Sequence, residues 1–128
     1  MPLVKVNLRK GRTAEDKTAI GTAIQAALVS TLNVPEADRY QLFTEFDDDN
    51  FQHTSAYLGM DYSSRLLMIE ITFLVGRDDD LKKAFLAQMN KNLVEAGLVR
   101  PEDVFVMITE AGLANVSFGR GLAQRAGQ

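Results

Sequence analysis

The residue best suited to chemistry stands at the start of the chain, where Met1 is followed by Pro2. If the initiator methionine is removed, the nitrogen of Pro2 becomes a secondary amine on a rigid ring. An α-amino group ordinarily has a pKa of about 7.7–8.0, and an apolar or cationic pocket lowers that pKa because it disfavours the charged form. Such an amine is a usable base at physiological pH. The alternative is that a small second residue only permits removal of the methionine.

The elements that would position this amine follow from an internal repeat. The two halves, about residues 2–64 and 65–128, share a strand followed by Gly-Arg, which ends at Arg12 in the first half and at Arg77 in the second. The residue that corresponds to the proline in the second half is Leu67, which is internal and has no free amine. Each chain therefore has one potential active centre.

Each half predicts a strand, a helix and a second strand. In the first half, Thr13 and Asp16 resemble a capping box, and an apolar helical repeat follows them and ends before Pro35. In the second half, three aspartates at residues 78–80 favour a helix start, and Gly97 is a plausible C-terminal cap. The closing strands are predicted over residues 40–44 and 104–108.

These units predict an α/β (α+β) fold. A parallel strand–helix–strand crossover is right-handed, so two units side by side give a four-stranded sheet with both helices on one face. We expect the other face to remain apolar, through residues such as Val4, Val6, Ile69 and Ile71. Such a face favours oligomerisation. Residues 47–64 and 115–128 lie outside the repeat and are expected to form loops or short edge strands that reach a neighbouring subunit.

Composition excludes several kinds of site. The 128 residues include no cysteine and a single histidine, which rules out disulfides, thiol nucleophiles and multi-histidine metal sites. The longest apolar run, residues 66–75, is too short to cross a bilayer, and the N-terminus alternates instead of forming a signal-peptide core. A net charge of -3 argues against general nucleic-acid binding. We expect one cytoplasmic domain over residues 1–128, with no nucleic-acid or membrane partner.

Several of these motifs together resemble the tautomerase superfamily. They are Met1-Pro2-Leu3, Gly11-Arg12, the Val-Pro-Glu-Ala-Asp-Arg-Tyr-Gln run at residues 34–41 and the Ser-Phe-Gly-Arg-Gly run at residues 117–121. The resemblance covers essentially the whole chain. It implies paired strand–helix–strand units in a homotrimer, an N-terminal proline that performs the chemistry, and no cofactor. The length and the motifs at residues 38–41 and 117–121 are most similar to the malonate semialdehyde decarboxylase branch.

The resemblance also implies which cations hold a substrate carboxylate. The decarboxylase pattern has two arginines, separated by one residue, at the end of the third strand. Arg77 matches the second arginine, and Val75 stands where the first would be. Arg12 resembles a substrate-carboxylate contact of shorter tautomerases, and its alternative role is a surface ion pair with Glu15 or Asp16, which contributes little to stability.

Four further residues are candidates for the site. The resemblance makes Asp38 a partner that orients water or assists the proline, whereas its repeat mate Asp103 favours a shared turn-capping role. Tyr40 is a candidate hydrogen-bond donor to a developing enolate, or it simply packs in the sheet. Phe118 is either a wall of the proline pocket or part of a subunit contact. Arg39 is a candidate to reach the substrate across a subunit boundary.

These residues predict a cofactor-independent enzyme that acts on a small keto acid or related carboxylate. In the first hypothesis, neutral Pro2 moves a proton between carbon and oxygen in a keto–enol tautomerisation. In the second, protonated Pro2 polarises a carbonyl while Asp38 positions water, as in a malonate semialdehyde decarboxylase-like decarboxylation or hydration. The third is a trimeric binding or signalling protein that retains the fold without turnover.

Overall fold

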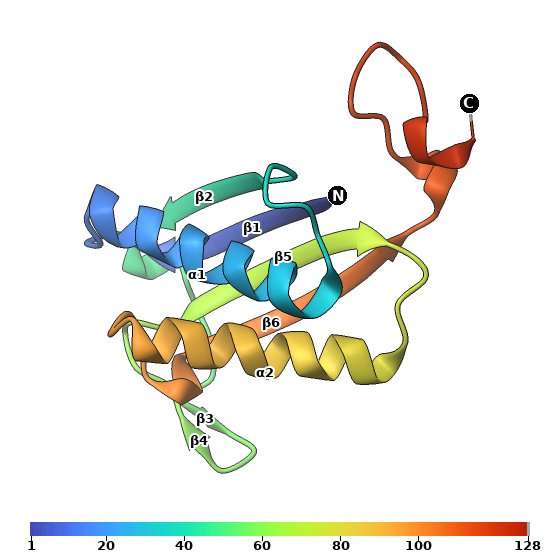
Figure 1. The fold of residues 1–128 in the computed structure, drawn as a ribbon. Helices are drawn as coiled ribbons and strands as arrows, with labels where there is room; N and C mark the ends of the chain where they lie inside the picture. The colour runs from blue at the N-terminus through green and yellow to red at the C-terminus, as the bar shows by residue number, and fades with distance from the viewer. Residues whose placement is uncertain (128) are drawn as a thin grey trace.

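Two helices lie side by side on one face of a four-stranded sheet in the computed structural model, which describes residues 1–127 (Figure 1). The main strands are β1 (Pro2–Arg9), β2 (Tyr40–Phe46), β5 (Leu67–Leu74) and β6 (Val104–Ala111), and a small hairpin holds β3 (Ala56–Tyr57) and β4 (Met60–Asp61). The helices are α1 (Ala14–Leu32) and α2 (Asp79–Glu95). Single 3₁₀ turns occupy Asp48–Asn50, Pro101–Asp103, Leu113–Asn115 and Gln124–Ala126. Over the described residues, no helix combines the length and apolar character needed to span a membrane.

The sheet confirms the predicted repeat. Strands β1 and β2 pair in parallel, as do β5 and β6, and each pair is joined through a helix. The halves meet where β1 and β5 pair antiparallel, so the sheet order is β2-β1-β5-β6. In this register Pro2 lies opposite Phe73. The start of β1 therefore lies beside the end of β5, and the first half's proline is brought to the second half's Gly-Arg turn.

Local capping signals were predicted correctly. The Thr13 side chain accepts a hydrogen bond from the backbone N–H of Asp16 at 3.0 Å, and Asp78 accepts one from Leu81 at 2.9 Å. Helix α1 ends with Asn33 in the left-handed region at φ 59°. Gly97 follows α2 at φ 73°, a conformation that favours glycine. These short-range interactions explain why both helix boundaries could be read from the sequence.

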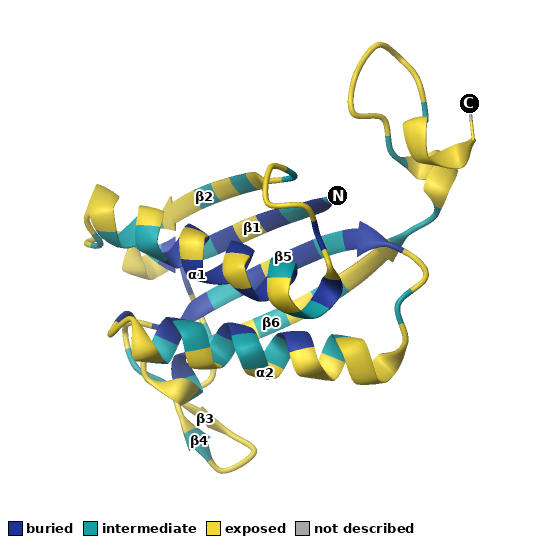
Figure 2. Ribbon diagram, in the orientation of Figure 1, coloured by how far each residue is buried: buried dark blue, intermediate teal, exposed yellow. Residues whose placement is uncertain are grey.

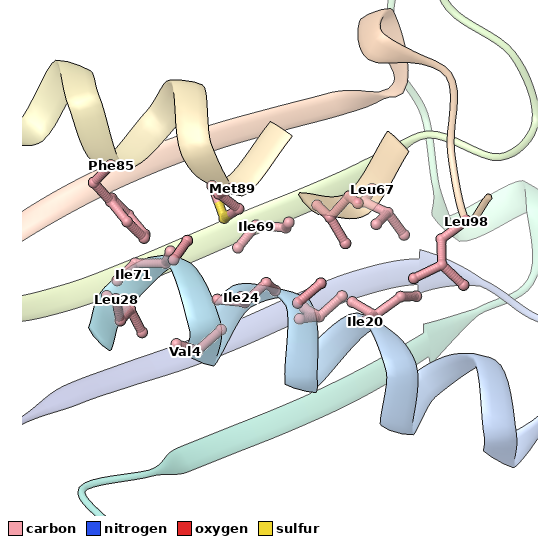
Figure 3. Close-up of a cluster of buried hydrophobic side chains, with 14 of the residues drawn as sticks. Val4, Ile20, Ile24, Leu28, Leu67, Ile69, Ile71, Phe85, Met89 and Leu98 are labelled. Carbon is pink, nitrogen blue, oxygen red and sulfur yellow. The ribbon is translucent and has the colours of Figure 1, made fainter. Parts of the chain in front are cut away.

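The apolar core fills the space between the helices and the sheet (Figures 2 and 3). Its largest fully buried side chains include Val4, Ile69 and Ile71 from the sheet and Ile24, Phe85 and Met89 from the helices. The expectation that Val4, Val6, Ile69 and Ile71 form the uncovered face is therefore wrong. Alternation along a strand shows which residues share a face, but it does not show which face the helices cover.

The uncovered face of the sheet is apolar chiefly on its outer strands. Leu42 on β2 is 52% exposed and Met107 on β6 is 57% exposed. On the central strands Lys5 lies opposite Glu70, and both are exposed. The face thus carries two apolar stripes with charged residues between them, which is more polar than the sequence predicted.

Two segments outside the repeat project from the body (Figure 1). The β3–β4 hairpin extends beyond one end of the sheet, and Leu58 at its tip is 78% exposed. The tail after β6 extends at the opposite end, where the N-terminus also lies. Both segments were predicted as loops or short strands, and the tail forms part of the site described next.

Candidate active site

Pro2 lines an apolar pocket of about 250 Å³ at the start of β1, called here the apolar pocket. The other lining residues are Met1, Leu3, Tyr40, Val116, Ser117 and Phe118. The rings of Tyr40 and Phe118 face each other with centroids 6.1 Å apart. Because β1 and β2 are parallel neighbours, their first residues lie side by side, and residues 116–118 of the tail line the pocket beside them. The structure therefore brings Pro2, Tyr40 and Phe118 together in one pocket, and their roles in catalysis stay predictions.

Asp38 lies at the mouth of the same site. Its carboxylate forms an ion pair with the amino group of Met1. The buried side chain of Gln25 fixes this turn, since its Nε2 donates to the carbonyl of Asp38 at 3.1 Å and to that of Glu36 at 3.3 Å. A carboxylate is thus held against the N-terminal amine by the helix behind it.

A second pocket of about 230 Å³, called here the cationic pocket, lies on the other side of Met1. It is lined by Met1, Leu74, Val75, Arg77, Leu113 and Arg125. The Arg77 guanidinium lies 5.0 Å from the centroid of the Phe73 ring. Its hydrogen bonds to the carbonyls of Leu74 and Leu32 are both long, at 3.4 Å, so an incoming carboxylate meets little competition.

Met1 lines both pockets, and this connection was not foreseen. Arg125 was also missed, because it belongs to no motif and reaches Arg77 only through the path of the tail. Val75 is 48% exposed and lines the same pocket as Arg77 and Arg125. The structure therefore supplies two guanidiniums around the valine that departs from the family pattern.

Arg39 points away from these pockets. Its Nε donates to Oε1 of Gln41 at 3.2 Å, and Gln41 in turn donates to the carbonyl of Gly21 on α1 at 2.8 Å. Within one chain, Arg39 thus lies toward α1. Its role across a subunit boundary stays a prediction.

Arg12 follows the far end of β1, at the opposite end of the strand from Pro2. Its guanidinium donates to the carbonyls of Leu98 and Arg65, both at 3.0 Å. Burial, and secondarily the charge of Arg65, lower the pKa of Arg12. Within one chain, therefore, Arg12 is not part of the Pro2 site, and its hydrogen bonds go to backbone carbonyls and not to the acidic residues proposed as its alternative partners.

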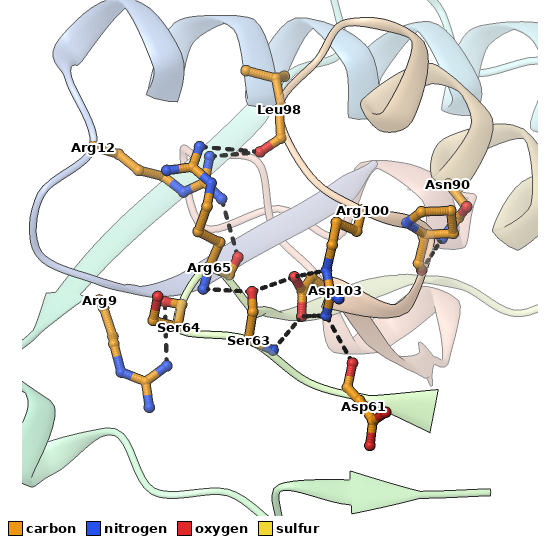
Figure 4. Close-up of polar contacts among 11 residues, drawn as sticks. Arg9, Arg12, Asp61, Ser63, Ser64, Arg65, Asn90, Leu98, Arg100 and Asp103 are labelled. Carbon is orange, nitrogen blue, oxygen red and sulfur yellow. Dashed lines mark hydrogen bonds and ion pairs between the residues drawn. The ribbon is translucent and has the colours of Figure 1, made fainter. Parts of the chain in front are cut away.

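Asp103 occupies the place of Asp38 in the second half (Figure 4). It is fully buried and accepts hydrogen bonds from the backbone N–H of Ser63 at 2.8 Å and from Nε of Arg100 at 3.1 Å. Burial alone would raise the pKa of Asp103, but the hydrogen bonds from Arg100 and Ser63 outweigh it and lower that pKa. Each aspartate contacts the residues just before the first strand of its half: Asp103 accepts a hydrogen bond from Ser63, and Asp38 pairs with the amino group of Met1. Of the two, Asp38 is the one in contact with a free amine.

Comparisons with known proteins agree with this arrangement. Two family models, each described as "Tautomerase enzyme", match residues 38–119 and residues 2–59. The probable tautomerase YusQ of Bacillus subtilis (strain 168) is 30% identical over 97% of this chain and 98% of that protein.

Solved structures of tautomerase-like proteins also resemble this chain. A malonate semialdehyde decarboxylase inhibited by 3-bromopropiolate superposes with a TM-score of 0.90 at 33% identity, over 97% of this chain and 94% of that one. A malonate semialdehyde decarboxylase studied for its decarboxylase and hydratase activities gives a TM-score of 0.91 at 28% identity, over 97% and 95%. A fused 4-OT, described as an asymmetric trimer, shares the fold at 23% identity and a TM-score of 0.79, over 98% and 99%. The chain belongs to the tautomerase superfamily, in a branch similar to malonate semialdehyde decarboxylase.

Proposed function

We propose that removal of Met1 frees the Pro2 amine, which then catalyses keto–enol tautomerisation of a small keto acid. The observation that carries this proposal is that Met1 lines both the apolar and the cationic pocket. Loss of that one residue would join the two pockets, and together they reach the size of ordinary ligand sites, about 300–1,000 Å³. The new amine would then stand between an apolar wall and two guanidiniums.

In this proposal neutral Pro2 takes a proton from the carbon next to the substrate carbonyl and returns it elsewhere. Arg77 binds the substrate carboxylate through two parallel hydrogen bonds, which a planar guanidinium can form. Tyr40 lies on the apolar side and donates to the enolate oxygen as charge develops there. Phe118 excludes water from the amine.

We assign Arg125 the place left open by Val75. The two residues line the cationic pocket with Arg77, so a second guanidinium reaches the carboxylate from the tail instead of from the strand. The substrate carboxylate would then bridge β5 and the C-terminal segment. Closure of the tail on the substrate would follow from this bridge.

The test compares the purified protein with Pro2→Ala in ketonisation of phenylenolpyruvate. Intact mass first establishes that Met1 is absent from both proteins. We expect Pro2→Ala to lower kcat by about 10²–10⁴-fold, the usual contribution of a positioned acid or base. Pro101→Ala, in the 3₁₀ turn before β6, is the matched control and should retain the wild-type rate. Equal rates for wild type and Pro2→Ala would show that Pro2 is not the base.

A second candidate is decarboxylation or hydration of a three-carbon acid. The ion pair between Asp38 and the N-terminal amino group of Met1 motivates it, because it places a carboxylate where it could position water beside the amine. Protonated Pro2 would polarise the carbonyl, and Asp38 would position water. A titration of the ¹⁵N-labelled Pro2 nitrogen separates the candidates: a pKa of about 6–7 supports tautomerisation, and a pKa well above about 8 supports the second reaction.

We also propose that the chain assembles as a homotrimer. The exposed apolar stripes that include Leu42 and Met107 need a cover, and two helices shield only the other face. The projecting hairpin and tail are suited to reach neighbouring subunits. In such a trimer Arg39 of one subunit is the candidate to enter the site of the next.

A further inference from the structure

The repeat gives the second half its own version of both pockets. A pocket of about 210 Å³, called here the second-half pocket, holds the counterparts of five of the six residues that line the cationic pocket, each 65 positions away in the chain; the exception is Arg125. The counterparts are Leu66 for Met1, Arg9 for Leu74, Lys10 for Val75, Arg12 for Arg77 and Asp48 for Leu113. A cavity of about 350 Å³ that includes Phe51, Gln52, Met68 and Phe105 corresponds in the same way to the apolar pocket. Most lining positions of the two pockets thus recur in the second copy of the repeat.

Two guanidiniums converge in the second-half pocket (Figure 4). Arg12 donates to the carbonyl of Leu98 at 3.0 Å, and Arg65 donates to the same carbonyl at 3.3 Å. Among residues 1–127 neither guanidinium forms an ion pair with a carboxylate. Two like charges therefore share one neutral acceptor, an arrangement that an added anion would stabilise.

The remaining charges of the pocket do not neutralise this pair. The pocket has a single acidic lining residue, Asp48, and its carboxylate pairs with Nε of Arg9 at 3.2 Å. Lys10 pairs with Asp47 at 3.0 Å. In Figure 4 the Arg9 guanidinium extends toward Ser64, away from Arg12 and Arg65. The charges of Asp16 and Asp103 act on Arg12, but neither carboxylate forms an ion pair with Arg12 or Arg65 among the described residues. The two arginines that share the Leu98 carbonyl therefore have no paired carboxylate.

We propose that the second-half pocket binds a small aliphatic carboxylate and does not convert it. Guanidinium groups match the two oxygens of a carboxylate through parallel hydrogen bonds, and the pocket volume suits a small acid. Leu67 stands where the first half has Pro2, and its nitrogen is an internal amide of β5, so this position offers no free amine. The inference does not depend on Pro2 being catalytic, because the two sites lie at opposite ends of β1.

The test is an NMR titration of the intact, ¹⁵N-labelled assembly with propionate, which has no keto group to react. The signals followed are the Nε–Hε groups of Arg12 and Arg65 and the backbone amide of Gly11. We expect these signals to shift with saturation. Arg65→Gln should weaken the titration of Gly11 by about tenfold or more, the range for loss of a charged hydrogen bond. Turnover at Pro2 should stay at the wild-type rate.

Matched variants separate this site from the one at Pro2. Arg77→Gln should leave the Gly11 titration unchanged while it weakens propionate binding at the cationic pocket. Propanol, which has the same chain length without the charge, should not shift Gly11. Should Arg65→Gln fail to fold, Arg65→Lys keeps the charge and should retain part of the affinity. Propionate that leaves Gly11 and Arg12 unshifted in the wild type, or binds equally to Arg65→Gln, would overturn the proposal.

Discussion

The reactivity of Pro2 depends on a single neighbouring residue. While Met1 is attached, the Pro2 nitrogen belongs to a peptide bond and is neither basic nor nucleophilic. The same methionine fills the space between the apolar and cationic pockets and holds Asp38 through its amino group. Its removal would therefore create the Pro2 amine and its binding space in one step, and it would release the Asp38 carboxylate from its ion pair.

Arg77 is expected to bind the carboxylate of the substrate. Arg77→Gln should lower kcat/KM by about 10–100-fold, mainly through KM, because it removes charged hydrogen bonds to the substrate. Steady-state kinetics with a keto-acid series measures this effect. Lys83→Gln, an exposed cation on α2, is the control and should behave as wild type. An unchanged KM in Arg77→Gln would place the carboxylate elsewhere.

Arg125 should act together with Arg77. Arg125→Gln is expected to raise KM by a smaller factor, roughly threefold to tenfold, since the residue is exposed and its charge is partly screened. The double variant should lose less than the product of the two single losses, because both guanidiniums bind one carboxylate. Strictly multiplicative effects would show that the two arginines do not share a ligand.

The sequence predicts the positions of some site residues better than those of others. Pro2, Tyr40 and Phe118 could be grouped in advance, because strand starts and family motifs fix their places. Arg125 could not, since its position depends on the path of an irregular tail. Arg12 has the repeat position of Arg77, but within one chain it lies at the opposite end of β1 from Pro2. A repeat alone does not show which copy lies near the amine, so the role of Arg12 as a carboxylate contact stays a prediction.

The secondary-structure elements were predictable where the signals are local. Caps at Thr13 and Asp78 act over three residues, and both formed as expected. Strands β2 and β6 extend past the predicted residues 44 and 108, to Phe46 and Ala111, because ladder pairing with a neighbouring strand continues there. The covered face of the sheet was assigned incorrectly, since that choice depends on crossover geometry and not on alternation.

Asp103 should make stability depend on pH at the entry to β5. Its pKa is lowered in the folded state, so its contribution is present above the unfolded value of about 3.9 and is lost as the pH falls through the folded value. Asp103→Asn should lower the free energy of unfolding at about pH 7 by roughly 1–3 kcal/mol, with a smaller difference at about pH 3. Urea unfolding at both pH values provides the measurement.

The control for this prediction is Asp49→Asn, in the exposed loop after β2. It should change the free energy of unfolding by less than about 0.5 kcal/mol at either pH. The difference in free energy of unfolding between wild type and Asp103→Asn should depend on pH. A difference that is the same at about pH 3 and about pH 7 would contradict the role given to Asp103.

At the level of the whole molecule, we expect the sheet face opposite the helices to control assembly. Leu42→Lys puts a charge in an apolar stripe of β2 and is expected to shift the protein from trimer to monomer. Light scattering coupled to size-exclusion chromatography gives the mass directly. Turnover should fall with the trimer fraction if Arg39 enters the site from a neighbouring subunit.

Leu81→Lys is the matched control, because Leu81 is an exposed leucine on α2, away from the sheet. It should leave the mass unchanged. If Leu42→Lys remains a trimer, the uncovered sheet face is not the interface. The trimer was predicted from the sequence by family resemblance and by the need to cover an apolar face, although the residues first named for that face were the wrong ones.

The most direct test of the central proposal is peptide mapping by mass spectrometry after incubation with 2-oxo-3-pentynoate. A free Pro2 amine would add to the triple bond of this keto acid, forming a nitrogen–carbon bond while its proton moves to the adjacent carbon. We expect Met1 to be absent and one adduct with the full reagent mass to lie on Pro2. Retained Met1, or modification confined to lysine side chains, would contradict it.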